Sequence, residues 1–397
     1  MEDCYSIMMT LGEVREAIRQ HLISLHPQNL PLDLSQWEWR DETFEEVLTG
    51  NREEKYLIPT TGFSLHHLYR GQNKEFIPCR PSLYRGNPNE LDVFIERLRL
   101  TEFKHLISEH PIVEGFFKPS HFKVDIEGLA QHYGLRTRVL DLTSSLDVAL
   151  FFAVCEYDRR TDSYKYFDDC REHNAVLYIF RPLYDNKRCP GPLPNSYLNH
   201  NITPIGLQAF PRPGRQHAFS LHLGKDTGIR AYKYKFSFSC VESKELYDRV
   251  MVGRQILDVK DILVRKTKQI AKRTTFSPKV FEAAFEEYWT GRESKSELIK
   301  ELSERRIGIY QFVKGACFSS KEKQEIIDAW NSGTGERMCK SIVRRKCFVL
   351  EVDEAGNTIP GRGEWYPCMS LEGLIHLQTL SLVQNPEGPK GAEWVNL

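Results

Sequence analysis

Polar side chains that could bind and transform an anionic ligand gather in one short stretch of the sequence. A Gln-His pair, Gln131 and His132, precedes Arg138 and Asp141, and a Thr-Ser-Ser run begins at Thr143. Histidine titrates near neutral pH and can serve as a general base, whereas arginine binds phosphate or carboxylate with a charged fork of donors. The stretch therefore indicates a ligand pocket, with His132 as its candidate base.

The residues around this stretch predict how it is positioned. Residues 139–142 are expected to form a strand, and nearly every residue from 146 to 154 is apolar, which is typical of a helix buried on all sides. Ser144 and Asp147 lie three positions apart, as in a capping box at a helix start. A strand that leads into a buried helix would hold the polar groups at the rim of a cleft, near helix N-terminal amides that favour anions.

Structural interpretations compete with these functional ones. A buried carboxylate must be paired, so Asp141 is expected to pair with Arg70 or Arg138. Thr143 and the two serines after it could serve only to cap the helix, and His132 could cap carbonyl groups at a helix end.

The composition is that of a globular protein without a strong net charge. Hydrophobic residues make up 41% of the 397 residues, and 54 Lys and Arg balance 54 Asp and Glu. Such a chain can bury a core, but it has no global field that would draw it onto nucleic acid, so a nucleic-acid partner stays an open question. No run of residues approaches the roughly 18 apolar residues that cross a membrane, and the N-terminus lacks the pattern of a signal peptide. We therefore expect a cytoplasmic protein with no membrane partner.

Metal and thiol chemistry have little support. The ten cysteines are scattered, with no C-x-x-C pair and no tight Cys/His cluster, so we expect reduced thiols and no metal. A metal hydrolase would have to bring together His132, Asp141, His217 and His222, which nothing in their spacing requires. A cysteine hydrolase is also a weak hypothesis, because Cys155 lies in the apolar helix.

Hydrophobic periodicity divides the chain into three parts. We expect an N-terminal helical extension in residues 1–60, a central domain in residues 61–270 and a smaller helical and β-hairpin region in residues 271–397. The fold class is predicted to be α+β, with a mixed or antiparallel sheet and surrounding helices. Expected strands are 64–69, 139–142, 175–180, 217–223 and 229–240; expected helices are 10–25, 35–48, 90–109, 126–133, 146–154, 243–251, 277–288, 294–305 and 321–330; a long loop is expected at 190–213 and a hairpin from 346.

Four motifs together resemble the signature of the FRG domain family. They are Tyr69-Arg70-Gly71-Gln72, the block from Gln131 to Thr143, Ala149 with Phe152-Ala153, and Arg212 with Gln216 before Phe219. The family is named for a Phe-Arg-Gly motif, and Tyr69 stands here at the Phe position. The resemblance spans residues 63–223, under half of the chain.

Two of these motifs also resemble ADP-ribosyltransferases of the Arg-Ser-Glu type. In that family a first strand ends in an arginine that holds NAD, and a second strand carries a Ser-Thr-Ser-like motif before an apolar helix. Arg70 and the run Thr143-Ser144-Ser145 match these two motifs in the same order. The resemblance implies a split sheet, NAD as the substrate, a macromolecular acceptor, and a role as an intracellular toxin or antiviral defence effector.

The same resemblance implies a set of site residues. Arg70 would hold the phosphates, while Thr143 and Ser144 would hold the ribose. Catalysis would depend on Arg70, Thr143, Gln216 and His132. Further nucleotide contacts would come from Gln72, Gln131, Arg138, Asp141 and Arg215.

The third motif departs from the transferase pattern at Gln216. The family has a glutamate there, which bonds the ribose 2′-hydroxyl and stabilises a positively charged transition state. An amide can hydrogen-bond but supplies no charge, and charge stabilisation is usually the largest catalytic term. Two function classes therefore remain: an NAD-dependent transferase or NAD glycohydrolase, and a non-catalytic module that senses a nucleotide or a protein partner.

Overall fold

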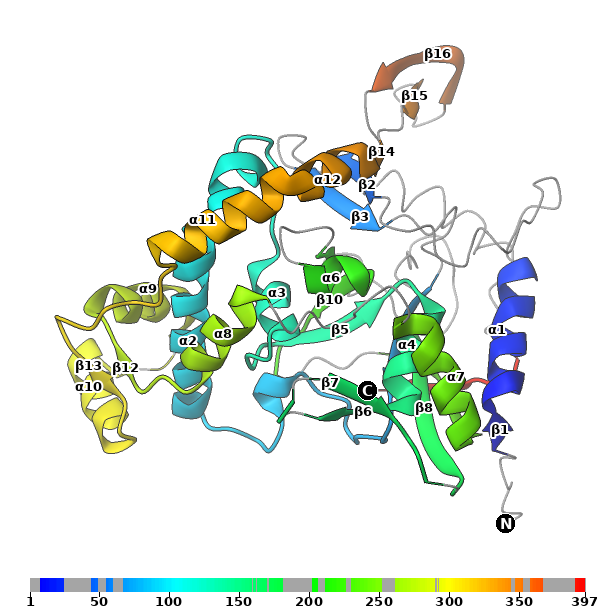
Figure 1. The fold of residues 1–397 in the computed structure, drawn as a ribbon, viewed down its shortest axis with the longest axis horizontal. Helices are drawn as coiled ribbons and strands as arrows, with labels where there is room; N and C mark the ends of the chain where they lie inside the picture. Colours follow the sequence, from blue (N-terminus) through cyan, green and yellow to red (C-terminus); the bar gives the residue numbers. More distant parts are fainter. Residues whose placement is uncertain are drawn as a thin grey trace.

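The computed structural model describes residues 8–24, 44–48, 55–59, 67–158, 160–161, 163–169, 171–180, 202–205, 211–225, 230–251, 261–289, 291, 293–343, 347–352, 358–366 and 390–396 (Figure 1). They form an α+β fold, in which helices surround an eight-stranded mixed sheet. The predicted fold class is confirmed.

The strands of the main sheet come from the first 238 residues of the chain and from its C-terminal end. In sheet order they are β1 (Met9–Thr10), β11 (Arg230–Phe238), β8 (His173–Phe180), β4 (Leu68–Gln72), β5 (Val139–Thr143), β10 (Ala218–His222) and β9 (Ile202–Pro204), and β17 (Glu393–Asn396) also pairs with β11. All neighbours are antiparallel except β1 and β11.

Small sheets and helices complete the described structure. The small sheets are β2 (Phe44–Leu48) with β3 (Lys55–Pro59) and β14 (Ile342–Val343), β6 (Cys155–Asp158) with β7 (Ser163–Tyr166), β12 (Thr275–Phe276) with β13 (Gly308–Ile309), and β15 (Cys347–Val352) with β16 (Thr358–Tyr366). The helices are α1 (Leu11–Ser24), α2 (Glu90–Ser108), α3 (Ile126–His132), α4 (Leu146–Val154), α6 (Pro211–Arg215), α7 (Cys240–Met251), α8 (Ile262–Ala271), α9 (Pro278–Tyr288), α10 (Lys295–Glu304), α11 (Ser320–Ala329) and α12 (Gly335–Ser341).

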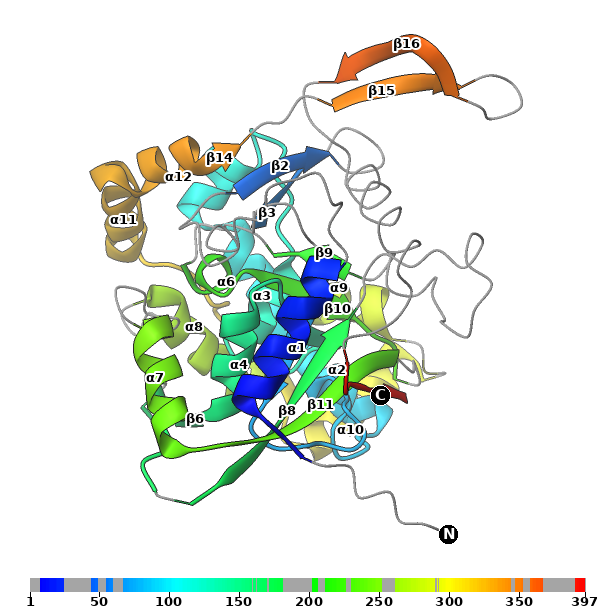
Figure 2. The ribbon, with the colours of Figure 1, turned by 90° about the vertical axis from the view of Figure 1, so that its right-hand side faces the viewer.

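The main sheet is buried on both faces, which explains the continuous apolar run in β8. Ala175, Leu177 and Ile179 pack into one hydrophobic cluster, whereas the alternate residues of β8 pack into a second cluster on the other face. Helices α1, α4 and α7 cover the first face, and α1 crosses in front of β8 and β11 in Figure 2. The aromatic residues of β11 alternate along the strand and are all buried: Tyr232, Tyr234, Phe236 and Phe238.

The central helix α4 packs directly on β4. Six of its nine residues are buried, as the apolar sequence predicts. Gly71 makes this approach possible, because a Cβ atom there would lie 1.7 Å from the carbonyl oxygen of Ala149. Glycine at this position therefore sets the distance between α4 and the strand that carries Arg70.

The helices of the C-terminal third pack against the central part. Phe276, Phe281 and Leu298 share a cluster with Phe94 of α2. Phe318 lies in another cluster with residues of α2, α3 and α8. The boundary near residue 270 stays a prediction, and the described C-terminal helices share these clusters with α2 of the central part.

Most predicted elements are confirmed, with two corrections. A helix was expected at residues 35–48. This prediction is wrong for the described residues of that range, because Phe44–Leu48 forms strand β2 and pairs with Lys55–Pro59. The loop expected at residues 190–213 includes the short strand β9 and the start of α6 among its described residues. Both are short elements that pairing or packing stabilises, which local periodicity does not reveal.

Candidate functional site

A cavity of about 650 Å³ opens where β4 and β5 separate. These strands pair only through Tyr69 and Thr143, although Leu68–Gln72 and Val139–Thr143 run antiparallel. Further walls come from the end of α3, the β6–β7 hairpin, residues near α6, and α8. The cavity thus lies in a split of the main sheet, at the place where the sequence predicted a cleft.

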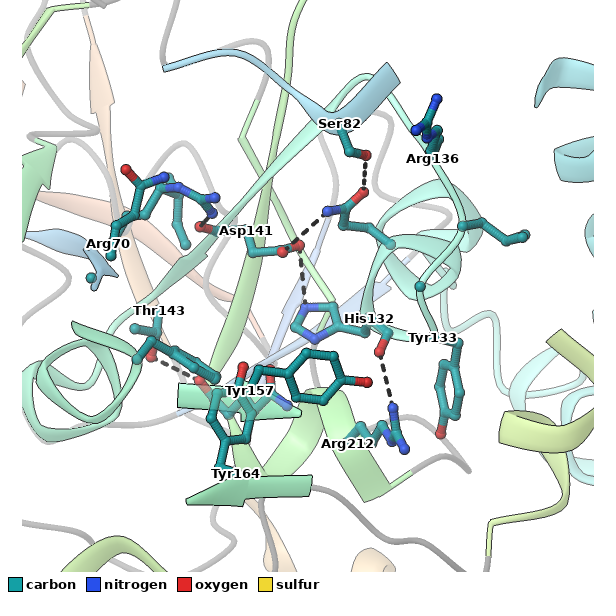
Figure 3. A pocket seen from close by; sticks show the side chains of 18 of the residues that line it. Arg70, Ser82, His132, Tyr133, Arg136, Asp141, Thr143, Tyr157, Tyr164 and Arg212 are labelled. Atoms are coloured by element: carbon teal, nitrogen blue, oxygen red, sulfur yellow. Dashed lines mark hydrogen bonds and ion pairs between the residues drawn. The ribbon is translucent and has the colours of Figure 1, made fainter. Parts of the chain in front are cut away.

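Arg70 bridges the split with its side chain. Its Nη1 donates a hydrogen bond of 2.8 Å to the backbone carbonyl of Asp141, and its buried Nε has no hydrogen-bond partner among the described residues (Figure 3). The expected pairing of Arg70 with the Asp141 carboxylate is wrong, because the guanidinium meets the carbonyl of a strand edge that β4 leaves unpaired. Donors of Arg70 therefore remain for a ligand.

The Asp141 carboxylate is oriented by Gln131 instead. Gln131 donates from Nε2 to Oδ2 of Asp141 at 3.4 Å, while its Oε1 accepts hydrogen bonds from the hydroxyls of Ser82 at 3.0 Å and Thr137 at 2.9 Å. These two donors fix the amide orientation of Gln131. Ser82 and Thr137 therefore hold the Gln131 amide, and Gln131 in turn holds the Asp141 carboxylate at the cavity wall.

His132 faces the same carboxylate from the end of α3. Its Nε2 lies 3.8 Å from Oδ1 of Asp141, and the His132 side chain is only 4% exposed (Figure 3). Burial lowers the pKa of His132, with the opposing effects of Asp141 and of a hydrogen bond with Gln216 too small to reverse it. The imidazole is therefore neutral at physiological pH, in the form that can accept a proton.

A hydrogen bond joins Thr143, at the end of β5, to Gln216, which follows α6. The Thr143 hydroxyl donates to the carbonyl of Gln216 at 2.7 Å and accepts a hydrogen bond from the Ser145 amide at 3.0 Å. Both residues line the cavity, but the Thr143 hydroxyl already uses its proton within the protein. Thr143 thus fixes the turn between β5 and α4.

The lining carries far more positive than negative charge. Its cationic side chains are Arg70, Arg85, Arg136, Arg212 and Lys268, and Asp141 is its one carboxylate among the described residues. Arg70 and Arg212 lie within the cavity, with Arg212 only 3% exposed, whereas the other three are exposed at its edge. Such a lining attracts anionic ligands.

Arg212 is a site residue that the predicted set missed. Its Cζ lies 5.0 Å from the ring centre of Tyr133, a cation–π contact, and its Nη1 donates to the carbonyl of His132 at 3.4 Å. Arg212 was part of the motif before Phe219, which was the available signal. Lys268 of α8 also lines the cavity, whereas its neighbours Arg265 and Lys266 pair with Glu322 instead.

Aromatic side chains form much of the remaining wall. Tyr164 of the β6–β7 hairpin contacts Phe152 of α4, with ring centres 5.4 Å apart, and Tyr157 of the hairpin, with ring centres 5.1 Å apart. Tyr157 is 38% exposed, so one ring of this group reaches solvent. The group offers flat apolar surfaces on which a planar ligand ring could stack.

The structure brings seven predicted site residues to the cavity and places three elsewhere. Arg70, Gln72, Gln131, His132, Asp141, Thr143 and Gln216 line it. Arg138 does not, because its Nε pairs with Glu127 of α3 at 3.1 Å. Ser144 and Arg215 are also absent from the lining.

The cap of α4 is Ser145, whose side chain accepts from the Val148 amide, so the expected capping box at Ser144 is wrong.

The described residues offer neither a cluster of metal ligands nor a helix that could span a membrane. These residues contain no group of three or more His, Cys, Asp and Glu side chains placed to hold a metal ion. His222, one member of the metal-hydrolase hypothesis, bonds Asp125 at 3.1 Å. None of the described helices is both long enough and apolar enough to span a bilayer.

Comparison with known proteins gives one match. The family model of the FRG domain matches residues 66–162, a segment that carries Arg70, His132, Asp141 and Thr143 but ends before Arg212 and Gln216. No curated protein and no solved structure matches the chain. The site thus combines an FRG-like segment with cavity residues from outside it.

Proposed function

We propose that the cavity binds a nucleotide that contains a pyrophosphate, and that the protein acts on NAD as an ADP-ribosyltransferase-like or NAD-hydrolysing enzyme. The observation that carries the proposal is the composition of the lining, in which five cationic side chains face one carboxylate beside six aromatic rings. Phosphates need cations and aromatic bases need flat surfaces, and this cavity supplies both. A volume of about 650 Å³ is also within the usual range for small-molecule sites.

Arg70 and Arg212 are the proposed phosphate contacts. Both are arginines, whose planar forks can bind two phosphate oxygens at once, and both are held in place by hydrogen bonds to backbone carbonyls. Arg85, Arg136 and Lys268 at the edge would raise the local concentration of an anionic ligand. Phosphate binding thus depends on residues from β4 and α6 together.

The ribose and nicotinamide would lie toward Asp141, His132 and Gln216. His132 is neutral and can accept a proton from an attacking water or acceptor hydroxyl. Gln216 hydrogen-bonds with His132 and would orient it. Ser144, outside the lining, has no role in this proposal, and Thr143 acts by fixing the turn. A macromolecular acceptor and a role as an intracellular toxin or antiviral effector stay part of the proposal.

The test is to incubate the purified protein with NAD, with and without cell lysate. Released nicotinamide, free ADP-ribose and labelled macromolecules are then measured for the native protein, for Arg70→Ala and for Arg70→Lys. Arg171→Ala is the matched control, because Arg171 is 82% exposed and pairs only with neighbouring Asp169 in the described structure. We expect turnover in the native and control proteins and its loss in both Arg70 variants. No product from the native protein would overturn the enzymatic proposal.

A non-catalytic nucleotide sensor is the second candidate. It is favoured by Gln216, whose neutral amide stands where the transferases carry a glutamate. Tight NAD binding without any product, measured by calorimetry on the same preparation, would select this candidate. Arg70→Ala should then weaken binding at least about tenfold, a loss of 1.4 kcal/mol or more.

A further inference from the structure

Asp141 is an unusual residue for a cavity that otherwise suits anions. It contributes the one carboxylate among the described lining residues, against five cations. Its side chain is 34% exposed, so it faces the cavity and is not a buried core residue. A carboxylate in this position weakens the binding of any purely anionic ligand. The Asp141 carboxylate therefore favours a ligand that carries a positive group.

The carboxylate is held in one orientation. Gln131 donates to Oδ2 of Asp141, and the amide of Gln131 is itself fixed by the hydroxyls of Ser82 and Thr137. Figure 3 shows this series of contacts reaching from Ser82 to Asp141, which lines the cavity. A surface carboxylate that served only solubility would not need such support.

No described neighbour neutralises Asp141. Arg70 donates a hydrogen bond from Nη1 to the backbone carbonyl of Asp141 and not to its carboxylate. His132 is the other close group, and burial keeps its imidazole uncharged. Oδ1 of Asp141 is buried and has no hydrogen-bond partner among the described residues. The charge of Asp141 is thus not neutralised within the described structure, and its side chain, 34% exposed, presents that charge to the cavity although Oδ1 itself is buried.

We infer that Asp141 makes the cavity selective for a ligand that carries a positive charge beside its phosphates, so that it takes oxidised NAD⁺ in preference to NADH or a nucleoside triphosphate. The inference rests on the proposed function and adds the identity of the group that selects the oxidised form. The pyridinium ring of NAD⁺ is positive, whereas the dihydropyridine ring of NADH is neutral, and their phosphates are the same. Arg70 and Arg212 would bind the pyrophosphate of either form, while Asp141 would distinguish them.

The experiment measures binding and does not depend on turnover. The probe is a carbocyclic NAD⁺ analogue, which keeps the pyridinium but resists cleavage, compared with its reduced form and with ATP by calorimetry. We expect the native protein to bind the oxidised analogue at least about tenfold more tightly than the reduced one. Asp141→Asn should remove this preference and bind ATP more tightly than the native protein, since one negative charge has left the cavity.

The outcomes separate the inference from the proposed function. Failure of the native protein to bind any of the three ligands would overturn both. Equal binding of the two analogue forms, or a preference that Asp141→Asn retains, would overturn the inference alone. Asp141→Glu is the second variant, because it keeps the charge and should keep a preference for the oxidised form. A thermal melt of each variant confirms that it is folded before its affinities are compared.

Discussion

Tyr69 and Thr143 form the single residue pair that joins β4 to β5 in the described sheet. In a continuous antiparallel sheet the next residues would also pair, and the backbone would close the space between the strands. Here the Arg70 side chain bonds the Asp141 carbonyl across the opening. The single pair therefore creates the cavity, and the split predicted for the sheet is seen at the two strands that carry the candidate site.

Replacement of Gly71 tests how closely α4 must approach β4. A Cβ at Gly71 would lie 1.7 Å from the Ala149 carbonyl oxygen, and backbone atoms cannot give way cheaply. We expect Gly71→Ala to lower the free energy of unfolding by about 3 kcal/mol, measured by urea titration. Gly12→Ala is the control, because Gly12 lies in α1 with nothing within 4 Å, and it should be neutral or stabilising by up to about 1 kcal/mol. Equal effects of the two changes would contradict this account of the packing.

Glu127 should be essential for stability, although it lies outside the cavity. It pairs with Arg97 at 2.6 Å and with Arg138 at 3.1 Å, and the side chains of Glu127 and Arg97 are 9% and 7% exposed. Glu127→Gln would leave Arg97 as an uncompensated buried charge, which costs about 3–5 kcal/mol of unfolding free energy.

The control for Glu127 is Glu156→Gln. Glu156 also forms an ion pair, with Lys165, but both side chains are about half exposed or more. Denaturant unfolding should show a change within about 0.5 kcal/mol for this variant. A small effect of Glu127→Gln would mean that the buried network contributes less than its geometry indicates.

Neighbouring serines before α4 should respond differently to the same substitution. Ser145 caps the helix by accepting from the Val148 amide at 3.3 Å, so Ser145→Ala should cost about 1 kcal/mol in thermal or chemical unfolding. The buried Ser144 hydroxyl has no hydrogen-bond partner among the described residues, so Ser144→Ala should change stability by less than about 0.5 kcal/mol. A larger loss of stability in Ser144→Ala than in Ser145→Ala would instead identify Ser144 as the cap.

Acid should destabilise the protein through its buried histidines. Burial lowers the pKa of His110 to about 3 and that of His217 to about 4, while the pKa of His132 is also lowered. Below about pH 6.5 the unfolded chain binds protons at these histidines and the folded protein does not, so stability falls as the pH decreases. Each such histidine contributes up to about 1.4 kcal/mol per pH unit down to its folded pKa.

Chemical unfolding measured between pH 7 and pH 5 checks this slope. His110→Asn keeps an acceptor for the Ile112 amide, which bonds Nδ1 of His110 in the native protein, but removes the titrating group. Its unfolding free energy should depend less steeply on pH. Unchanged stability of the native protein across this range would show that the histidines protonate without unfolding.

The sequence by itself determined much of the secondary structure and seven of the cavity residues. Apolar periodicity predicted α2, α3, α4 and α9, because burial of one face or of all faces repeats at fixed spacing along the chain. The motifs at Arg70 and from Gln131 to Thr143 led to the cavity because they lie on adjacent strands and the helices beside them. The short elements β2, β9 and α6 escaped prediction, since pairing or packing with other segments stabilises them and local periodicity does not reveal it.

Only the tertiary structure decided which side chains share the cavity and with which charge. It turned Arg138 toward Glu127 and brought Arg212 and Lys268 to the lining from segments far from β4. It also gave Asp141 its partners, Gln131 and His132, in place of an arginine. Which side chains face the cavity depends on where the pairing of β4 with β5 stops. Strand pairing joins residues that are distant in the chain, so no local sequence pattern reveals it.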